Sequence, residues 1–214
     1  MQSNDLTLWG IGTVRQMRPH WMLLEMGLEY EFHPTHPRSG QTYDLDFLKL
    51  NPRHKVPVLR HGTFVLTESA AITLYVSEAF KAPTGIYVPQ DAVGRAKVNE
   101  WCYFIMSELD AHTLYIMRRH GALKSLYGDA PVAIAAAREY FIDQFNAVAS
   151  RIGAEGRYLF GEDLSAADII LTTTLDWAIE YDLPLPDCAL EYRSRVAARP
   201  AYQEARRRTF PAVS

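Results

Sequence analysis

The chain has 214 residues, of which 48% are hydrophobic and 22% are charged, and its formal net charge is −3. This length allows one large domain or two small ones with a buried core, and the composition is that of a globular protein. Because the net charge is small and negative, we expect no nucleic-acid surface. An apolar run of about 18 residues is absent, so we expect no membrane span, and MQSNDLTLWG lacks the features of a signal peptide.

The two cysteines, Cys102 and Cys188, lie far apart in the sequence and form no CxxC pair. Their number and spacing predict neither a disulfide framework nor a zinc site. We therefore expect a cytoplasmic protein that carries no metal ion.

The first 80 residues alternate between short strand-like and helix-like segments. Residues 6–9 form the first expected strand, and residues 19–26 the first helix, with Pro19 in its first turn and Gly27 at its end. Then follow a strand at 28–33, a short helix at 47–50, strands at 58–60 and 64–66 joined through His61-Gly62, and a helix at 68–80. The order βαβαββα predicts a mixed sheet with helices on both faces.

The pattern changes after residues 81–90, KAPTGIYVPQ, whose two prolines and one glycine indicate a linker. Apolar residues then recur at three- and four-residue steps in 98–112 and in 133–152, and a third helix is expected near Ser165. We therefore divide the chain into an α/β domain at 1–82 and an all-helical domain at 91–214.

The segment KVPVL at 55–59 is apolar enough for a buried strand, yet Pro57 cannot donate a hydrogen bond within a sheet. One interpretation is a cis Val56–Pro57 peptide bond, which proline allows at small cost. The N–H and C=O of Val56 would then be free to pair with an extended ligand. The other interpretation is a trans proline in an edge strand.

The segment TESAAI at 67–72 places Ser69 at the expected start of a helix. Free backbone N–H groups and a hydroxyl there suit a carboxylate, and Glu68 would attract an ammonium group. Together they fit the charged head of an α-amino acid. Alternatively, Thr67 or Ser69 merely caps the helix.

The segment GEDLSAAD at 161–168 has Ser165 and Asp168 at the N-cap and N3 spacing of a capping box, with Asp in place of the usual Glu or Gln. We interpret this pair as structural, because a buried capping box orients a helix without contacting substrate.

In this order, the segments resemble the cytosolic glutathione S-transferase family, with some features of bacterial nu-like members. The resemblance covers nearly the whole chain and rests on LLEMGLEYE at 23–31, NPRHKVPVL at 51–59, LTESAAITLY at 66–75, GEDLSAADI at 161–169 and RPAY at 199–202. It implies a thioredoxin-like N-terminal domain, an all-α C-terminal domain, a homodimer, and glutathione as co-substrate.

The resemblance also implies roles for individual residues in binding glutathione. Pro57 would be cis, and the Val56 backbone would bind the cysteinyl part. Lys55, with Gln41, would lie near the glycyl carboxylate. By the same likeness, the γ-glutamyl end of glutathione would be held by Glu68 and Ser69.

Where family members carry a catalytic Tyr, Ser or Cys, this chain has Thr13, and some nu-like members use threonine there. Its hydroxyl would donate to the glutathione sulfur and lower a thiol pKa that is about 8.5 in the free molecule. Arg15 is the other candidate, although the sequence favours a solvated arginine at a helix start over a role with the thiolate. The resemblance implies conjugation of glutathione to a small electrophile, a detoxification reaction. The alternatives are glutathione-dependent disulfide reduction and a non-catalytic binding role.

Overall fold

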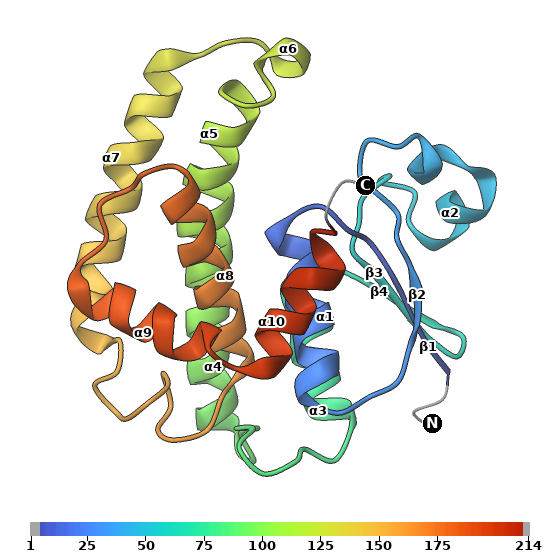
Figure 1. Cartoon of the computed structure of the whole chain (residues 1–214), viewed down its shortest axis with the longest axis horizontal. Coiled ribbons are helices and arrows are strands. Elements are labelled where there is room, and N and C mark those ends of the chain that lie inside the picture. The colour runs from blue at the N-terminus through green and yellow to red at the C-terminus, as the bar shows by residue number, and fades with distance from the viewer. Residues whose placement is uncertain (1–4, 212–214) are drawn as a thin grey trace. The chain divides into compact units, whose positions relative to one another are not determined.

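The computed structural model describes residues 5–211 (Figure 1), so the outermost residues of the two expected domains, 1–4 and 212–214, lie outside the described part. The chain forms two compact units, one made of the residues up to Val88 together with those from Ala197 onward, and one made of Pro89–Val196. The break at Val88 falls within the expected linker. The last helix, however, belongs to the first unit and not to the helical one.

A four-stranded mixed sheet with the strand order β2-β1-β3-β4 organises the first unit. Its strands are β1 (Leu6–Trp9), β2 (Glu31–His33), β3 (Val58–His61) and β4 (Phe64–Thr67). β1 runs parallel to β2 and antiparallel to β3, and in this register Leu8 lies between Phe32 and Leu59. β3 and β4 form the hairpin predicted around His61-Gly62. The predicted βαβαββα order is therefore confirmed.

Helices cover both sides of this sheet. Figure 1 shows α1 (Val14–Glu25) and α3 (Ser69–Ala79) on one side and α2 (Leu45–Leu50) on the other. On the α2 side, Phe47 packs in a small buried cluster with Val56 and Val58. The short helix η2 (Gln41–Tyr43) precedes α2, and the last helix, α10 (Pro200–Thr209), packs against α1.

The start of α1 differs from the prediction. The helix begins at Val14, after Thr13 in an extended conformation, so Pro19 lies inside it and not in its first turn. An interior proline removes one backbone hydrogen bond. Met17 and Trp21 are nevertheless fully buried, and this packing outweighs the lost bond because each large buried side chain contributes about 1.5–3 kcal/mol.

The second strand is also shorter than the predicted 28–33. Gly27 has a φ of +63°, and the N–H of Leu28 bonds back to the carbonyl of Leu23 at 3.0 Å. The chain is thus still closing the end of α1 at residue 28, and β2 can begin only at Glu31.

Polar contacts fasten α10 to α1. The Glu25 carboxylate accepts hydrogen bonds from Arg199 Nε at 2.7 Å and Nη2 at 2.6 Å. It also accepts one from Trp21 Nε1 at 2.8 Å, and the Trp21 ring meets Tyr202 edge to face at a centroid distance of 5.0 Å. The RPAY segment at 199–202 is therefore part of the first unit's core.

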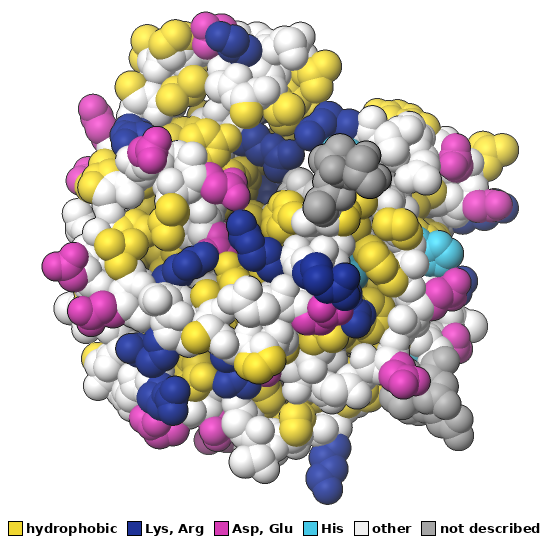
Figure 2. Space-filling view, viewed as in Figure 1, with side chains coloured by type: hydrophobic (Ala, Val, Ile, Leu, Met, Phe, Trp, Pro, Cys, Tyr) yellow, Lys and Arg dark blue, Asp and Glu magenta, His cyan; other side chains and the backbone are white. Residues whose placement is uncertain are grey.

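The second unit is helical, as predicted. It comprises α4 (Ala92–Phe104), the π-helical η3 (Ile105–Leu114), α5 (Tyr115–His120), α6 (Lys124–Tyr127), α7 (Pro131–Val148), η4 (Ala149–Arg151), α8 (Ala166–Glu180) and α9 (Asp187–Ala197). None of the helices among residues 5–211 has the length and apolar character needed to cross a membrane. On the face drawn in Figure 2, acidic and basic side chains are interspersed.

The predicted capping box at the start of α8 is confirmed. The Ser165 hydroxyl accepts the N–H of Asp168 at 3.3 Å, and the Asp168 carboxylate accepts the N–H of Ser165 at 2.8 Å. The same carboxylate also accepts the Leu159 N–H at 2.8 Å and the Tyr192 hydroxyl at 2.5 Å. Complete burial raises the pKa of the Asp168 carboxyl, against these hydrogen bonds, which lower it.

Candidate functional site

The loop between β1 and α1 requires two glycines. Gly10 has a φ of +132°, and a Cβ there would lie 2.7 Å from Gln16 Cγ and 3.0 Å from Val56 Cβ. Gly12 has a φ of +86°, and its Cβ would meet the His36 ring at 2.6 Å. A side chain at either position would displace its neighbours, so the loop lies directly against Gln16 and Val56 at Gly10 and against His36 at Gly12.

Thr13 ends this loop at the N-cap position of α1. The residue is 8% exposed, and its side chain makes no capping hydrogen bond to the helix. Instead its hydroxyl donates to Gln16 Oε1, and Gln16 Nε2 donates to the carbonyl oxygen of Val56 at 3.1 Å. Gln16 thus joins Thr13 to Val56.

The Val56–Pro57 peptide bond is cis. No residue within 5–211 accepts a hydrogen bond from the N–H of Val56. The preceding loop is held by Asn51, whose Nδ2 donates to the carbonyl of Lys55 at 2.8 Å and whose Oδ1 accepts the N–H of Arg53 at 3.1 Å. The Val56 N–H is therefore a fixed donor in a loop whose shape other residues maintain.

Helix α3 begins without a side-chain cap, so the interpretation that Thr67 or Ser69 merely caps it is wrong. Glu68 occupies the N-cap position with a φ of +74°, an uncommon conformation for a residue with a side chain. Ser69 is buried, and its Oγ accepts a hydrogen bond from Arg18 Nη1 at 3.2 Å. No side chain among residues 5–211 thus caps the backbone N–H groups of the first turn.

Arg53 orients the side chains beside this helix start. Its Nη1 lies 2.8 Å from Glu68 Oε1, and its Nη2 donates to the Thr67 hydroxyl at 3.0 Å. Both members of the ion pair are largely exposed, so the pair contributes little to stability. Its effect is to fix the direction of the Glu68 carboxylate.

A buried histidine contacts the loop between β1 and α1. His20 Nε2 faces the carbonyl of Gly10 at 3.2 Å, and its Nδ1 lies 2.8 Å from the Tyr30 hydroxyl. Because a carbonyl can only accept, Nε2 carries the proton and Nδ1 accepts from Tyr30. Arg208 Nη1 in turn donates to the Tyr30 oxygen at 3.0 Å. Burial is the main cause that lowers the His20 pKa from 6.5 to about 4, so the ring is neutral.

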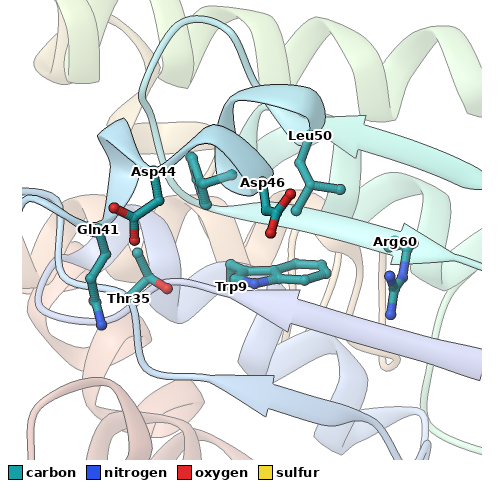
Figure 3. Close-up of a pocket in the computed structure, with 8 residues that line it drawn as sticks. Trp9, Thr35, Gln41, Asp44, Asp46, Leu50 and Arg60 are labelled. Carbon is teal, nitrogen blue, oxygen red and sulfur yellow. The ribbon is translucent and has the colours of Figure 1, made fainter.

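The other predicted site residues are more exposed. Lys55 is exposed beside Val56, and Arg15 is half-buried on α1. Gln41 is exposed and lines a cavity of about 400 Å³ between α2 and the sheet, with Trp9 and Arg60 (Figure 3). The segment that carries Gln41 contacts the loop that carries Lys55. In this contact, His54 Nδ1 lies 3.1 Å from the carbonyl of Thr42.

Three residues of this neighbourhood were missed in the sequence: Gln16, Arg18 and Arg53. TVRQ at 13–16 has capping-box spacing, which could have drawn attention to Gln16. No local pattern signals Arg18, since a fully buried arginine is rare and depends on tertiary contacts. Within the described residues, no group of three or more His, Cys, Asp or Glu side chains could hold a metal ion.

The first unit has a thioredoxin-like fold, and a helical unit accompanies it. The chain belongs to the glutathione S-transferase family. Residues 4–78 match the family's N-terminal domain and residues 131–208 match its C-terminal domain, which together make up more than half of the chain.

The relatives are moderately similar in sequence. Glutathione S-transferase theta-1 of Bos taurus is 29% identical over 150 residues, which make up 69% of this chain and 62% of that protein. Theta-3 of Mus musculus is 44% identical over 75 residues, 35% of this chain and 31% of that protein. The chain thus spans less than two thirds of the length of both relatives.

Solved structures extend the likeness over almost the whole chain. A glutathione transferase from Methylococcus capsulatus is 27% identical with a TM-score of 0.78, covering 94% of this chain and 96% of that one. A delta-class glutathione transferase from Nilaparvata lugens is also 27% identical, with a TM-score of 0.79 and coverage of 94% and 92%.

Proposed function

We propose that the chain is a glutathione transferase that activates the thiol of glutathione for attack on a small electrophile. The observation that carries this proposal is that α1 makes hydrogen bonds to both other parts of the candidate site. Gln16 donates to Val56, and Arg18 donates to Ser69. Family membership supplies the ligand class for this arrangement.

In this proposal the uncapped start of α3 takes the γ-glutamyl end of glutathione. Its carboxylate would accept the first-turn N–H groups and the Ser69 hydroxyl, and its ammonium would pair with Glu68. The N–H of Val56 would donate to the cysteinyl part. Lys55 and Gln41, both exposed, would serve the glycyl carboxylate.

The thiol would be activated at the start of α1, where Thr13 and Arg15 lie. Because this helix start has no side-chain cap, its first-turn N–H groups and its dipole favour a negative charge nearby. Lowering the thiol pKa by about two units needs about 2.7 kcal/mol of differential stabilisation, and one such unit corresponds to about 1.4 kcal/mol.

Isothermal titration with glutathione tests the binding part. We expect saturable binding by the unaltered chain and an affinity about ten- to a hundredfold lower for Glu68→Gln, because a charge-assisted hydrogen bond is worth about 1.5–3 kcal/mol. Glu78→Gln, at an exposed position near the other end of α3, is the matched control and should bind normally. Equal affinities for both variants would remove Glu68 from the site.

The second substrate is best sought with a panel of chloronitrobenzene, a peroxide and a mixed disulfide. Turnover of the first supports conjugation. Turnover of the mixed disulfide alone would assign glutathione-dependent disulfide reduction instead, which needs an activated glutathione but no protein cysteine. Glutathione binding without turnover of any of them would favour the non-catalytic role.

We also propose that the chain acts as a homodimer in the cytoplasm, on the basis of family membership. Sedimentation at micromolar concentration should give twice the mass of one chain. A species with the mass of a single chain would refute the dimer without bearing on glutathione binding.

A further inference from the structure

The Thr13 hydroxyl has a single proton, and the structure directs that proton away from the place where a thiol would be activated. The hydroxyl lies against Gln16 Oε1, an oxygen that can accept but not donate. Thr13 is therefore the donor in this hydrogen bond. A donor that activates a thiolate must instead give its proton to the sulfur.

The orientation of the Gln16 amide requires Thr13 to be the donor in this hydrogen bond. Its other end faces the carbonyl oxygen of Val56 at 3.1 Å, and that oxygen also has no proton to give. Nε2 must therefore point to Val56, which leaves Oε1 for Thr13. Reversing the amide would place two acceptors against each other at Val56.

Packing holds Gln16 in this position. The residue is 3% exposed, and the Cα of Gly10 approaches its side chain so closely that a Cβ on Gly10 would lie 2.7 Å from Gln16 Cγ. If Thr13 turned its proton to a sulfur atom, Gln16 Oε1 would become a buried acceptor without a donor, which carries a free-energy cost.

We propose that Gln16 is a positioning residue of the glutathione site, which holds the Thr13 hydroxyl as a hydrogen-bond acceptor and withholds its proton from the glutathione sulfur. This inference rests on the proposed function. A neutral S–H can donate to the lone pairs of Thr13, whereas a thiolate would meet the same lone pairs unfavourably. When the thiol ionises, its proton leaves to water, and Gln16 neither gains nor loses a proton.

The proposal predicts that removing the amide increases ionisation of the thiol. In Gln16→Leu the hydroxyl proton of Thr13 is free to turn to the sulfur, and the pKa of bound glutathione should fall by about one to two units. Gln16→Glu is the matched control, because its carboxylate also loses the hydrogen bond to Val56 but still accepts from Thr13. Its bound thiol should have a pKa no lower than in the unaltered chain.

A double-mutant cycle isolates the role of Thr13. Thr13→Val removes the hydroxyl with little change of shape, and in the unaltered chain it should lower the thiol pKa slightly, because it removes the lone pairs that favour the neutral thiol. Combined with Gln16→Leu, it should raise the pKa from the low value of Gln16→Leu to that of Thr13→Val alone. The measurement is thiolate absorbance against pH with saturating glutathione, and thermal melting shows that each variant is folded.

The outcomes separate this inference from the proposed function. Absence of glutathione binding by the unaltered chain would overturn both. Normal binding with equal thiol pKa values in Gln16→Leu and Gln16→Glu would overturn the role of Gln16 alone, as would a Thr13→Val effect of the same size in both backgrounds. If Gln16→Leu does not fold, Gln16→Met carries the same test with a more flexible apolar side chain.

Discussion

Helices α8 and α1 both begin with a hydroxyl residue followed three positions later by a polar residue, and the two pairs are arranged differently. At α8, Ser165 and Asp168 bind each other's backbone N–H groups and close the helix start. At α1, the Thr13 hydroxyl donates to the Gln16 side chain, no side chain caps the helix, and the N–H of Gln16 bonds to the carbonyl of Thr13 at 3.1 Å. The same spacing therefore produces a closed start in one helix and an open one in the other.

The surrounding groups explain the difference. Around Asp168 the neighbours are donors, the N–H of Leu159 and the hydroxyl of Tyr192, and a carboxylate satisfies them. Beside Gln16 the neighbour is an acceptor, the carbonyl of Val56, and only a side chain with an N–H can bind it. The partners at hand, and not the motif, decide whether a helix start is available to a ligand.

The largest expected effect comes from breaking the closed start. Asp168→Ala leaves three or more buried donors unsatisfied, so we expect a loss of about 3–5 kcal/mol in the free energy of unfolding. Asp163→Ala, at an exposed position in the same segment, is the control and should change stability little. Urea denaturation measures both, and a loss below about 1 kcal/mol for Asp168→Ala would contradict the assigned network.

Acid should lower the stability of the folded chain through His20, which contacts the loop before α1. Its pKa is lowered from 6.5 to about 4 in the folded chain, so between these values the unfolded chain binds more protons. The contribution of the neutral His20 ring to the free energy of unfolding is therefore fully present above pH 6.5. It is lost as the pH falls toward 4, by about 3 kcal/mol. His20→Gln, which does not titrate, should lack this part of the pH dependence, and identical stability profiles for the two proteins would rule out the buried neutral ring.

Ser69 and Ser165 form a matched pair of buried serines at helix starts. Ser69→Ala should lower glutathione affinity about ten- to a hundredfold, because it removes a hydrogen bond to a charged group. Ser165→Ala should leave the affinity of the folded protein unchanged. Calorimetry on both variants decides, and similar losses of affinity in the two would mean that Ser69 has no specific role in binding glutathione.

The smallest effect concerns stability at the closed start. Ser165→Ala removes an N-cap, which costs about 1 kcal/mol. Chemical denaturation should therefore detect a modest shift of the midpoint without a change in the slope. An unchanged midpoint would mean that the Asp168 carboxylate alone maintains the start of α8.

The parts of the molecule that were predictable depend on local sequence. The βαβαββα order follows from short apolar runs and turns, and Ser165 and Asp168 are three residues apart, so their pairing needs no knowledge of the fold. The start of α1 was not predictable, because the burial of Met17 and Trp21 overrides the usual position of Pro19. The sequence does not identify Gln16 and Arg18 as site residues, because their partners, Val56 and Ser69, are distant in the sequence.

The placement of α10 has a consequence for how the protein is made. Arg199 must reach Glu25 across 174 positions of sequence, and the N–H of Gly12 bonds to the carbonyl of Thr209 at 2.9 Å. A ribosome synthesises the chain from its N-terminus, and domains generally fold as units during synthesis. The loop before α1 therefore receives its last backbone contact only after residue 209 has left the ribosome, and the second unit can fold before the first is complete.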